Sequence, residues 1–198
     1  MNNNIMNSSC LNSGYLEIIL GSMYSGKSSR LVEIYKQCNF CNIPVMAINH
    51  VIDNRYDNNL LSTHDKIKIP CIKSDLLKNI WPSDELLSAD VILINEGQFF
   101  SDIVETVLEL VEKQKKRVYI CGLDGDFKRE RIGNLLDLIP HCDEISKLKS
   151  LCSECKDGTH GIFSFRTTDE KDQVVIGSDI YKPLCRSCYN TLSLNKYM

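Results

Sequence analysis

Residues 21–28 read GSMYSGKS and match the pattern G-x-x-x-x-G-K-[ST] of phosphate-binding loops. Glycines let such a loop curl until several backbone N–H groups point at phosphate, and the helix that follows adds its positive end. Lys27 would reach the β- and γ-phosphates, and the Ser28 hydroxyl would help to hold Mg²⁺. The alternative is a Gly/Ser turn that matches by chance. It is disfavoured because an apolar, strand-like run, 15–20, precedes the loop and helical periodicity follows it. The loop therefore predicts a nucleoside triphosphate site.

A second pattern consists of two C-x-x-C pairs, Cys152/Cys155 and Cys185/Cys188. Each pair supplies two thiolates from one tight turn, and two such turns complete a tetrahedral zinc site. His160 could replace one cysteine, but the complete set makes this unnecessary. Four thiolates leave no open position, so we expect a structural zinc that ties down the intervening loop, residues 156–184. That loop contains two strand-like runs, 162–166 and 173–177, and it is suited to folding over a small ligand.

Polar residues also follow two apolar runs that are typical of strands. Residues 53–56 (DNRY) come after a predicted strand at 44–49, and residues 95–100 (NEGQFF) come after the apolar run 91–94. Catalytic and binding groups of open α/β sheets gather at the carboxyl ends of strands. Acidic residues in such positions lie near the metal of phosphate-loop enzymes, so we expect both segments at the site.

The elements that must position these residues alternate between helix and strand. Helical periodicity covers about 29–41 and 102–115, and a further strand is expected at 118–122. The alternation predicts an α/β fold with a parallel sheet of the P-loop NTPase type, flanked by helices and followed by a small C-terminal zinc-binding domain. We expect a disordered tail at 1–14, the P-loop domain at 15–150 and the zinc-binding domain at 151–192.

Composition narrows the class of protein further. The chain has 198 residues, of which 43% are hydrophobic, and a net charge of −3, so neither nucleic acid nor a membrane surface is an expected partner. No run is long and apolar enough to span a bilayer, and residues 1–13 lack the features of a signal peptide. Ten cysteines without an export signal favour a reducing compartment, the cytoplasm, where disulfides are not expected. The pair Cys38/Cys41 is interpreted as packing near a helix end.

In these motifs the chain resembles the type II thymidine kinase family, the cellular and poxviral type. The resemblance covers about residues 15–189. It rests on the phosphate-binding loop, the two cysteine pairs and four shorter motifs: DNRY at 53–56, THD at 63–65, EGQFF at 96–100 and LDG at 123–125.

The resemblance implies an ATP-dependent thymidine kinase of nucleoside salvage that uses Mg²⁺ and acts as a homotetramer. Glu96 would be the general base that takes the proton of the 5′-hydroxyl. The ATP-binding residues would be Gly21, Ser22, Met23, Tyr24, Ser25, Gly26, Lys27, Ser28, Asp53, Arg55, Asn95 and Gln98. The loop between the cysteine pairs, residues 156–184, corresponds to the family's lasso, which holds thymine largely through its backbone. The nucleoside-binding residues would be Phe99, Leu123, Phe127, Ser164, Gln173, Val174, Val175, Ile176, Gly177 and Tyr181. Deoxyuridine is a further expected substrate.

The chain departs from the family in three places. Asn95 replaces the usual metal-side aspartate, Asp126 stands where many members carry a small neutral residue, and the lasso differs slightly in length. Two alternatives stay open beside the kinase: a phosphate-loop ATPase with a mechanical or regulatory role, and a zinc-ribbon binding module with a vestigial nucleotide site.

Overall fold

The computed structural model describes residues 13–53, 60–63, 65–177 and 179–197. Most of the predicted N-terminal tail, Arg55 and His64 lie outside the described residues. The strands are β1 (Tyr15–Gly21), β2 (Val45–His50), β3 (Leu60–Ser62), β4 (Lys68–Pro70), β5 (Ile72–Ser74), β6 (Val91–Asn95), β7 (Arg117–Gly122), β8 (Glu144–Leu148), β9 (Ser150–Leu151), β10 (His160–Gly161), β11 (Phe163–Arg166) and β12 (Tyr181–Leu184). The α-helices are α1 (Lys27–Phe40), α2 (Asp84–Ser88), α3 (Ile103–Leu108) and α4 (Arg186–Tyr197).

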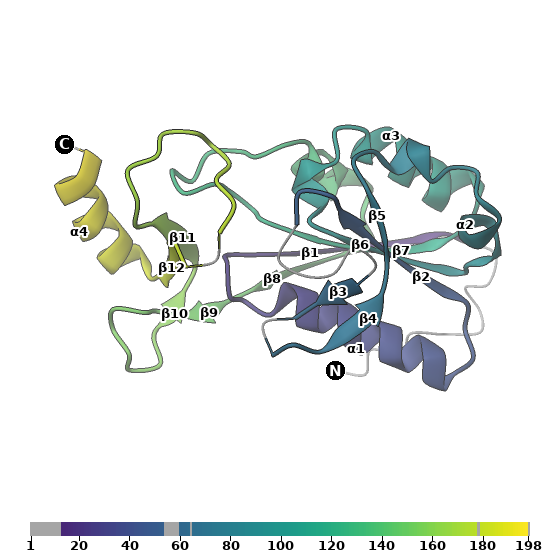
Figure 1. The fold of residues 1–198 in the computed structure, drawn as a ribbon, viewed down its shortest axis with the longest axis horizontal. Helices are drawn as coiled ribbons and strands as arrows, with labels where there is room; N and C mark the ends of the chain where they lie inside the picture. The colour runs from purple at the N-terminus through teal and green to yellow at the C-terminus, as the bar shows by residue number, and fades with distance from the viewer. Residues whose placement is uncertain (1–12, 54–59, 64, 178, 198) are drawn as a thin grey trace.

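A six-stranded sheet in the order β5-β2-β6-β7-β1-β8 forms the centre of the molecule. Every neighbouring pair in it is parallel, with Ile18 of β1 opposite Ile120 of β7. Helices α2 and α3 lie over one face and α1 over the other (Figure 1). The predicted α/β fold with a parallel sheet is confirmed.

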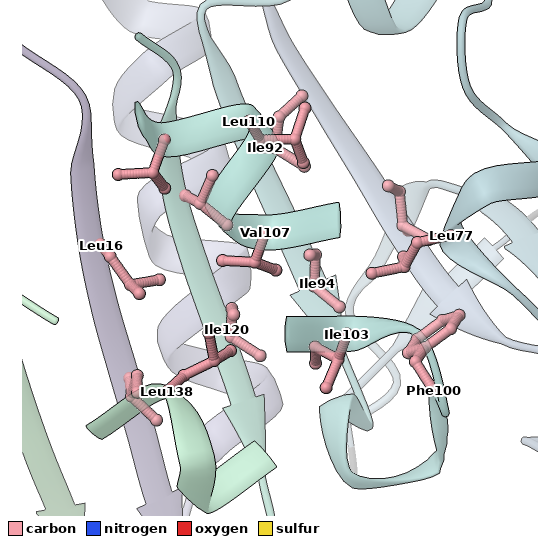
Figure 2. Close-up of a cluster of buried hydrophobic side chains, with 14 of the residues drawn as sticks. Leu16, Leu77, Ile92, Ile94, Phe100, Ile103, Val107, Leu110, Ile120 and Leu138 are labelled. Atoms are coloured by element: carbon pink, nitrogen blue, oxygen red, sulfur yellow. The ribbon is translucent and has the colours of Figure 1, made fainter. Parts of the chain in front are cut away.

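Side chains alternate between the two faces of the sheet, so the central strands contribute to a hydrophobic core on each face. On one face Ile92 and Ile94 of β6 pack with Ile120 of β7 and with Ile103 and Val107 of α3 (Figure 2). On the other face Leu93 and Cys121 pack against α1 and the β3–β4 hairpin. Burial on both sides explains why β6 is a continuous apolar run.

A small C-terminal unit lies beyond the β1–β8 side of the sheet (Figure 1). It contains the antiparallel pairs β9–β10 and β11–β12 and helix α4. Helix α4 continues to Tyr197, past the expected domain end at 192. Within the described residues, no helix has both the length and the apolar character needed to cross a membrane.

Two predicted elements differ from the structure. The run 173–177 is irregular, so the strand expected there is wrong: the Gln173 carbonyl accepts a hydrogen bond from Arg166 and that of Val175 accepts one from Tyr181. The helix expected at 102–115 is α-helical only over α3 and continues as a π-helix at Glu109–Lys113. The edge strand β8 was not predicted, because Glu144, Lys147 and other polar residues interrupt its apolar pattern.

Candidate active site

A pocket opens at the carboxyl ends of β1, β6 and β7, between the main sheet and the lasso. It is lined by Met23, Tyr24, Ser25, Gly26, Lys27, Ser28, Ser29, Ile52, Asp53, Ser62, Glu96, Phe99, Leu123, Gly125, Asp126, Phe127, Ile132, Ser164, Gln173, Val174, Val175, Ile176, Gly177 and Tyr181. Segments that lie far apart in the sequence thus converge on one cavity, which is the usual position of a ligand site in an open α/β sheet.

The loop between β1 and α1 has the geometry of an anion cradle. Gly26 precedes α1 with φ 88°, a left-handed conformation that favours glycine. A Cβ on Gly21 would lie 2.6 Å from the carbonyl oxygen of Leu148, so no larger residue fits there. Lys27 Nζ donates to the Ser22 carbonyl at 2.8 Å, which holds the ammonium over the loop. Ser25 Oγ is buried without a hydrogen-bond partner among the described residues, as expected of a group that serves a ligand.

A row of buried polar side chains lies behind Ser28. The Ser28 hydroxyl donates to Asn95 Oδ1 at 3.3 Å, and the Cys121 thiol donates to the same oxygen at 2.9 Å. Asn95 Nδ2 donates to Asn49 Oδ1 at 2.9 Å, and Asn49 Nδ2 donates to Asp53 Oδ2 at 3.2 Å. Burial raises the pKa of Cys121 to about 12, so this thiol stays protonated and remains a donor. The row connects Ser28 to a buried carboxylate through two neutral amides.

Glu96 has an unusual backbone conformation directly after β6. Its φ of 56° and ψ of 41° are left-handed, a conformation that is costly for a non-glycine residue and recurs at functional sites. Gln98 Nε2 donates to Glu96 Oε2 at 2.8 Å, and Gln98 Oε1 accepts from the Leu123 backbone N–H at 3.0 Å. The buried Gln98 therefore fixes the carboxylate relative to the end of β7.

Aromatic and small polar groups also line the pocket. The Phe99 ring lies 5.7 Å from that of His50, and burial lowers the pKa of this histidine, which favours its neutral form.

Two hydrogen bonds join the C-terminal unit to the phosphate-binding loop. Ser164 Oγ accepts from the Met23 N–H at 2.9 Å, and Ser22 Oγ donates to the Gly161 carbonyl at 3.1 Å. The C-terminal unit is thus bonded directly to the phosphate-binding loop.

Arg166 organises the lasso. Its side chain is fully buried and donates to the carbonyls of Glu170 and Gln173 and to the Tyr181 hydroxyl. That hydroxyl donates in turn to the Val175 carbonyl at 2.9 Å. One guanidinium therefore sets the path of the backbone that lines the pocket.

The four cysteines of the two pairs come together. Their Sγ atoms all lie within 4.8 Å of one another, with Cys155 3.5 Å from Cys188 and 3.8 Å from Cys185. A tetrahedron with Zn–S distances of about 2.3 Å has S–S edges of about 3.8 Å, so the thiols fit a zinc ion. His160 lies outside this group, and Cys38 is buried in the core whereas Cys41 is exposed.

Most predicted site residues lie at the pocket. Gly21, Ser22, Asn95 and Gln98 are not among the lining residues. Ser22, Asn95 and Gln98 each hydrogen-bond to a residue that lines the pocket. Sequence reasoning missed several lining residues, namely Ser29, Ile52, Ser62, Gly125 and Ile132, and it missed the buried Arg166 behind them. Asp126 was noted as a departure from the family pattern and not as a residue that lines the pocket. Ser29, Ile52 and Gly125 lie within or beside the predicted motifs, whereas no local signal marks Ser62, Ile132 or Arg166.

Known proteins match nearly the whole chain. The family model described as thymidine kinase matches residues 14–189. A thymidine kinase of Yaba monkey tumor virus is 38% identical over 178 residues, which are 89% of this chain and 95% of that protein. A cytosolic thymidine kinase of Cricetulus griseus is 36% identical over 177 residues, 89% of this chain and 73% of that protein. Thymidine kinase 1 of Dictyostelium discoideum is 35% identical over 183 residues, which are 90% of this chain and 78% of that protein.

Proposed function

The chain belongs to the thymidine kinase family and is a phosphotransferase, and we propose that it transfers the γ-phosphate of ATP to the 5′-hydroxyl of thymidine, giving thymidine monophosphate. One observation carries the proposal beyond family membership. Lys27 of the phosphate-binding loop and Glu96 at the end of β6 line the same pocket as the aromatic rings of Phe99 and Phe127. A nucleoside triphosphate that donates phosphate and a nucleoside with a planar base could therefore bind side by side in this pocket.

ATP would bind through the loop between β1 and α1. The N-terminus of α1 and the loop N–H groups would face the phosphates, and Lys27 would leave the Ser22 carbonyl to pair with the β- and γ-phosphates. Asp53 lines the same pocket, and Arg55, two positions further along the chain, is a further proposed ATP contact.

The residues near Ser28 suit a magnesium ion. The Ser28 hydroxyl and Asn95 Oδ1 are neighbouring oxygens, and Mg²⁺ takes oxygen ligands. When bound, Mg²⁺ would neutralise part of the charge on the β- and γ-phosphates. Because Asn95 is neutral, the nearest carboxylate in this row is that of Asp53, two amides away.

Glu96 would act as the general base. Gln98 donates to its carboxylate and so orients it toward the pocket, where it would accept the proton of the 5′-hydroxyl. Phosphoryl transfer depends chiefly on positioning and charge stabilisation, so a fixed carboxylate contributes by orienting the hydroxyl as well as by accepting its proton.

The nucleoside would lie between the aromatic side chains and the lasso. Phe99, Leu123, Phe127 and Ser164 would contact the base and sugar, Tyr181 would close one side, and the backbone of residues 173–177 would hydrogen-bond the base. Deoxyuridine lacks only the thymine methyl group. A methyl contributes about 1–3 kcal/mol of discrimination, so deoxyuridine should be used less efficiently and not excluded.

Zinc on Cys152, Cys155, Cys185 and Cys188 would be structural, because four thiolates leave no position for substrate. The two ends of the lasso would then be joined at one point. We further propose a cytoplasmic homotetramer that acts in nucleoside salvage. The location agrees with the name of the cytosolic relative, and sedimentation equilibrium would test the oligomeric state.

The direct test is phosphate transfer from ATP to thymidine, deoxyuridine and the other deoxynucleosides. We expect rapid transfer to thymidine, slower transfer to deoxyuridine and little to purine nucleosides. ATP hydrolysis at the same rate without any nucleoside would favour the ATPase alternative. ATP binding without either reaction would favour the binding module.

A further inference from the structure

We propose that Asp126 is a positioning residue for the nucleoside: through Gln173 it holds the lasso against residues 123–133 and so sets thymidine affinity. This inference rests on the proposed function, because it concerns the same pocket. The observation behind it is a hydrogen bond of 2.9 Å from Gln173 Nε2 to Asp126 Oδ2, which joins residues 47 positions apart.

The carboxylate is well fixed. Asp126 is only 6% exposed, and its other oxygen accepts from the backbone N–H groups of Lys128 at 2.8 Å and Glu130 at 2.9 Å. These bonds close the turn in which Asp126 lies. Since Oδ1 is occupied by the turn, Oδ2 is directed at the lasso and is the oxygen that Gln173 contacts.

Gln173 is held from both sides. Its side chain donates to Asp126 and to the Arg131 carbonyl at 3.0 Å, while its own carbonyl accepts from the buried Arg166 at 2.9 Å. Gln173 itself and the next four residues, 174–177, line the pocket. A displacement at Gln173 would therefore shift the backbone that is proposed to contact the base.

The strength of the contact suits a reversible link. The acceptor is a buried carboxylate, and hydrogen bonds to charged groups are stronger than neutral ones, but the Gln173 side chain is exposed to water. Such a bond can order the lasso and still break when a nucleoside enters or leaves. Among the described residues, the Gln173 side chain hydrogen-bonds to Asp126 and Arg131 and not to the phosphate-binding loop, so the loss of these bonds should change nucleoside affinity more than phosphate transfer.

The test begins with Gln173→Ala, which removes an exposed side chain and keeps the carbonyl that Arg166 holds. We expect the Kd and KM for thymidine to rise about 3–10-fold, with kcat and the KM for ATP changed less than about twofold. Hydrogen exchange at the amides of 173–177 should accelerate in the ligand-free protein. Lys171→Ala is the matched control, because this exposed lasso residue does not line the pocket.

A charge exchange tests the pair itself. Gln173→Glu places two carboxylates together and should weaken thymidine binding more than Gln173→Ala does. Adding Asp126→Asn restores an amide–carboxylate pair and should recover affinity to within about threefold of the native protein. Unchanged thymidine affinity and lasso exchange in Gln173→Ala, or no recovery in the double variant, would overturn the proposal.

Separate measurements test the proposed kinase activity and the proposed Asp126–Gln173 link, so the failure of one can be told from the failure of the other. Native protein that does not phosphorylate thymidine contradicts the proposed function. Faster lasso exchange in ligand-free Gln173→Ala supports the Asp126–Gln173 link whatever the substrate, because that measurement uses no nucleoside.

Discussion

The guanidinium carbon of Arg166 lies 3.7 Å from the ring centre of Phe127, so a fully buried cation stacks on an aromatic side chain of the pocket. The same guanidinium donates to lasso carbonyls and to Tyr181. Three parts of the proposed nucleoside site therefore depend on one planar group.

Replacing Arg166 with lysine should disturb all three parts. Lysine keeps the charge but lacks the planar fork, so carbonyls of the lasso lose donors and the stacking on Phe127 is lost. We expect a loss of about 2 kcal/mol in unfolding free energy, or about 4–8 °C in Tm, and a rise of at least tenfold in the KM for thymidine. Calorimetry and steady-state kinetics measure both.

Arg186→Lys is the control for that substitution. The Arg186 guanidinium also lies over a ring, 4.9 Å from the centre of Phe163, but this residue is exposed. Its replacement should change stability by less than about 0.5 kcal/mol. Equal effects of the two substitutions would show that Arg166 has no special role in the lasso.

Asn95→Asp should reduce the Mg²⁺ requirement and weaken the fold. A carboxylate beside Ser28 adds a negative charge near the metal. We expect this charge to strengthen Mg²⁺ binding by a net free energy of about 1–2 kcal/mol, which is about 5–30-fold in affinity. It also removes the amide donor to Asn49, whose own amide already donates to Asp53, so two carboxylates would compete for one buried amide. A Mg²⁺ titration of activity at fixed ATP, paired with thermal unfolding, tests both effects. An unchanged or higher requirement would mean that position 95 does not tune the metal.

Cys185→Ser should release zinc and open the lasso. Structural zinc sites contribute about 10 kcal/mol or more of apparent binding free energy in small domains, so the loss should weaken nucleoside binding more than ATP binding. Cys41→Ser is the control, since Cys41 is exposed and lies outside the four-cysteine group. Metal analysis should give one zinc per chain in the native and Cys41→Ser proteins. Native protein with far less zinc would contradict the assignment.

The sequence allowed prediction of the parts of the site that depend on local patterns. The phosphate-binding loop, the cysteine pairs and the apolar strand before Glu96 are each contiguous, so their spacing alone indicates what they form. The left-handed backbone of Glu96 has no such signal, because it depends on how β6 meets the segment that follows.

The lasso shows where such prediction ends. Residues 173–177 have β-forming side chains, yet their carbonyls bond to Arg166 and Tyr181 in place of a neighbouring strand. The bond between Asp126 and Gln173 joins distant segments, so neither residue alone indicates it. Long-range contacts of this kind decide the shape of the pocket and become visible only in the folded chain.

The most direct test of the account is the turnover of Glu96→Gln with ATP and thymidine. The substitution keeps the size of the side chain and its contact with Gln98 but removes the base, so kcat should fall about 10²–10⁴-fold while ATP still binds. Glu105→Gln, on the exposed side of α3, should keep native turnover. Near-native turnover in Glu96→Gln would contradict the proposed role of this carboxylate.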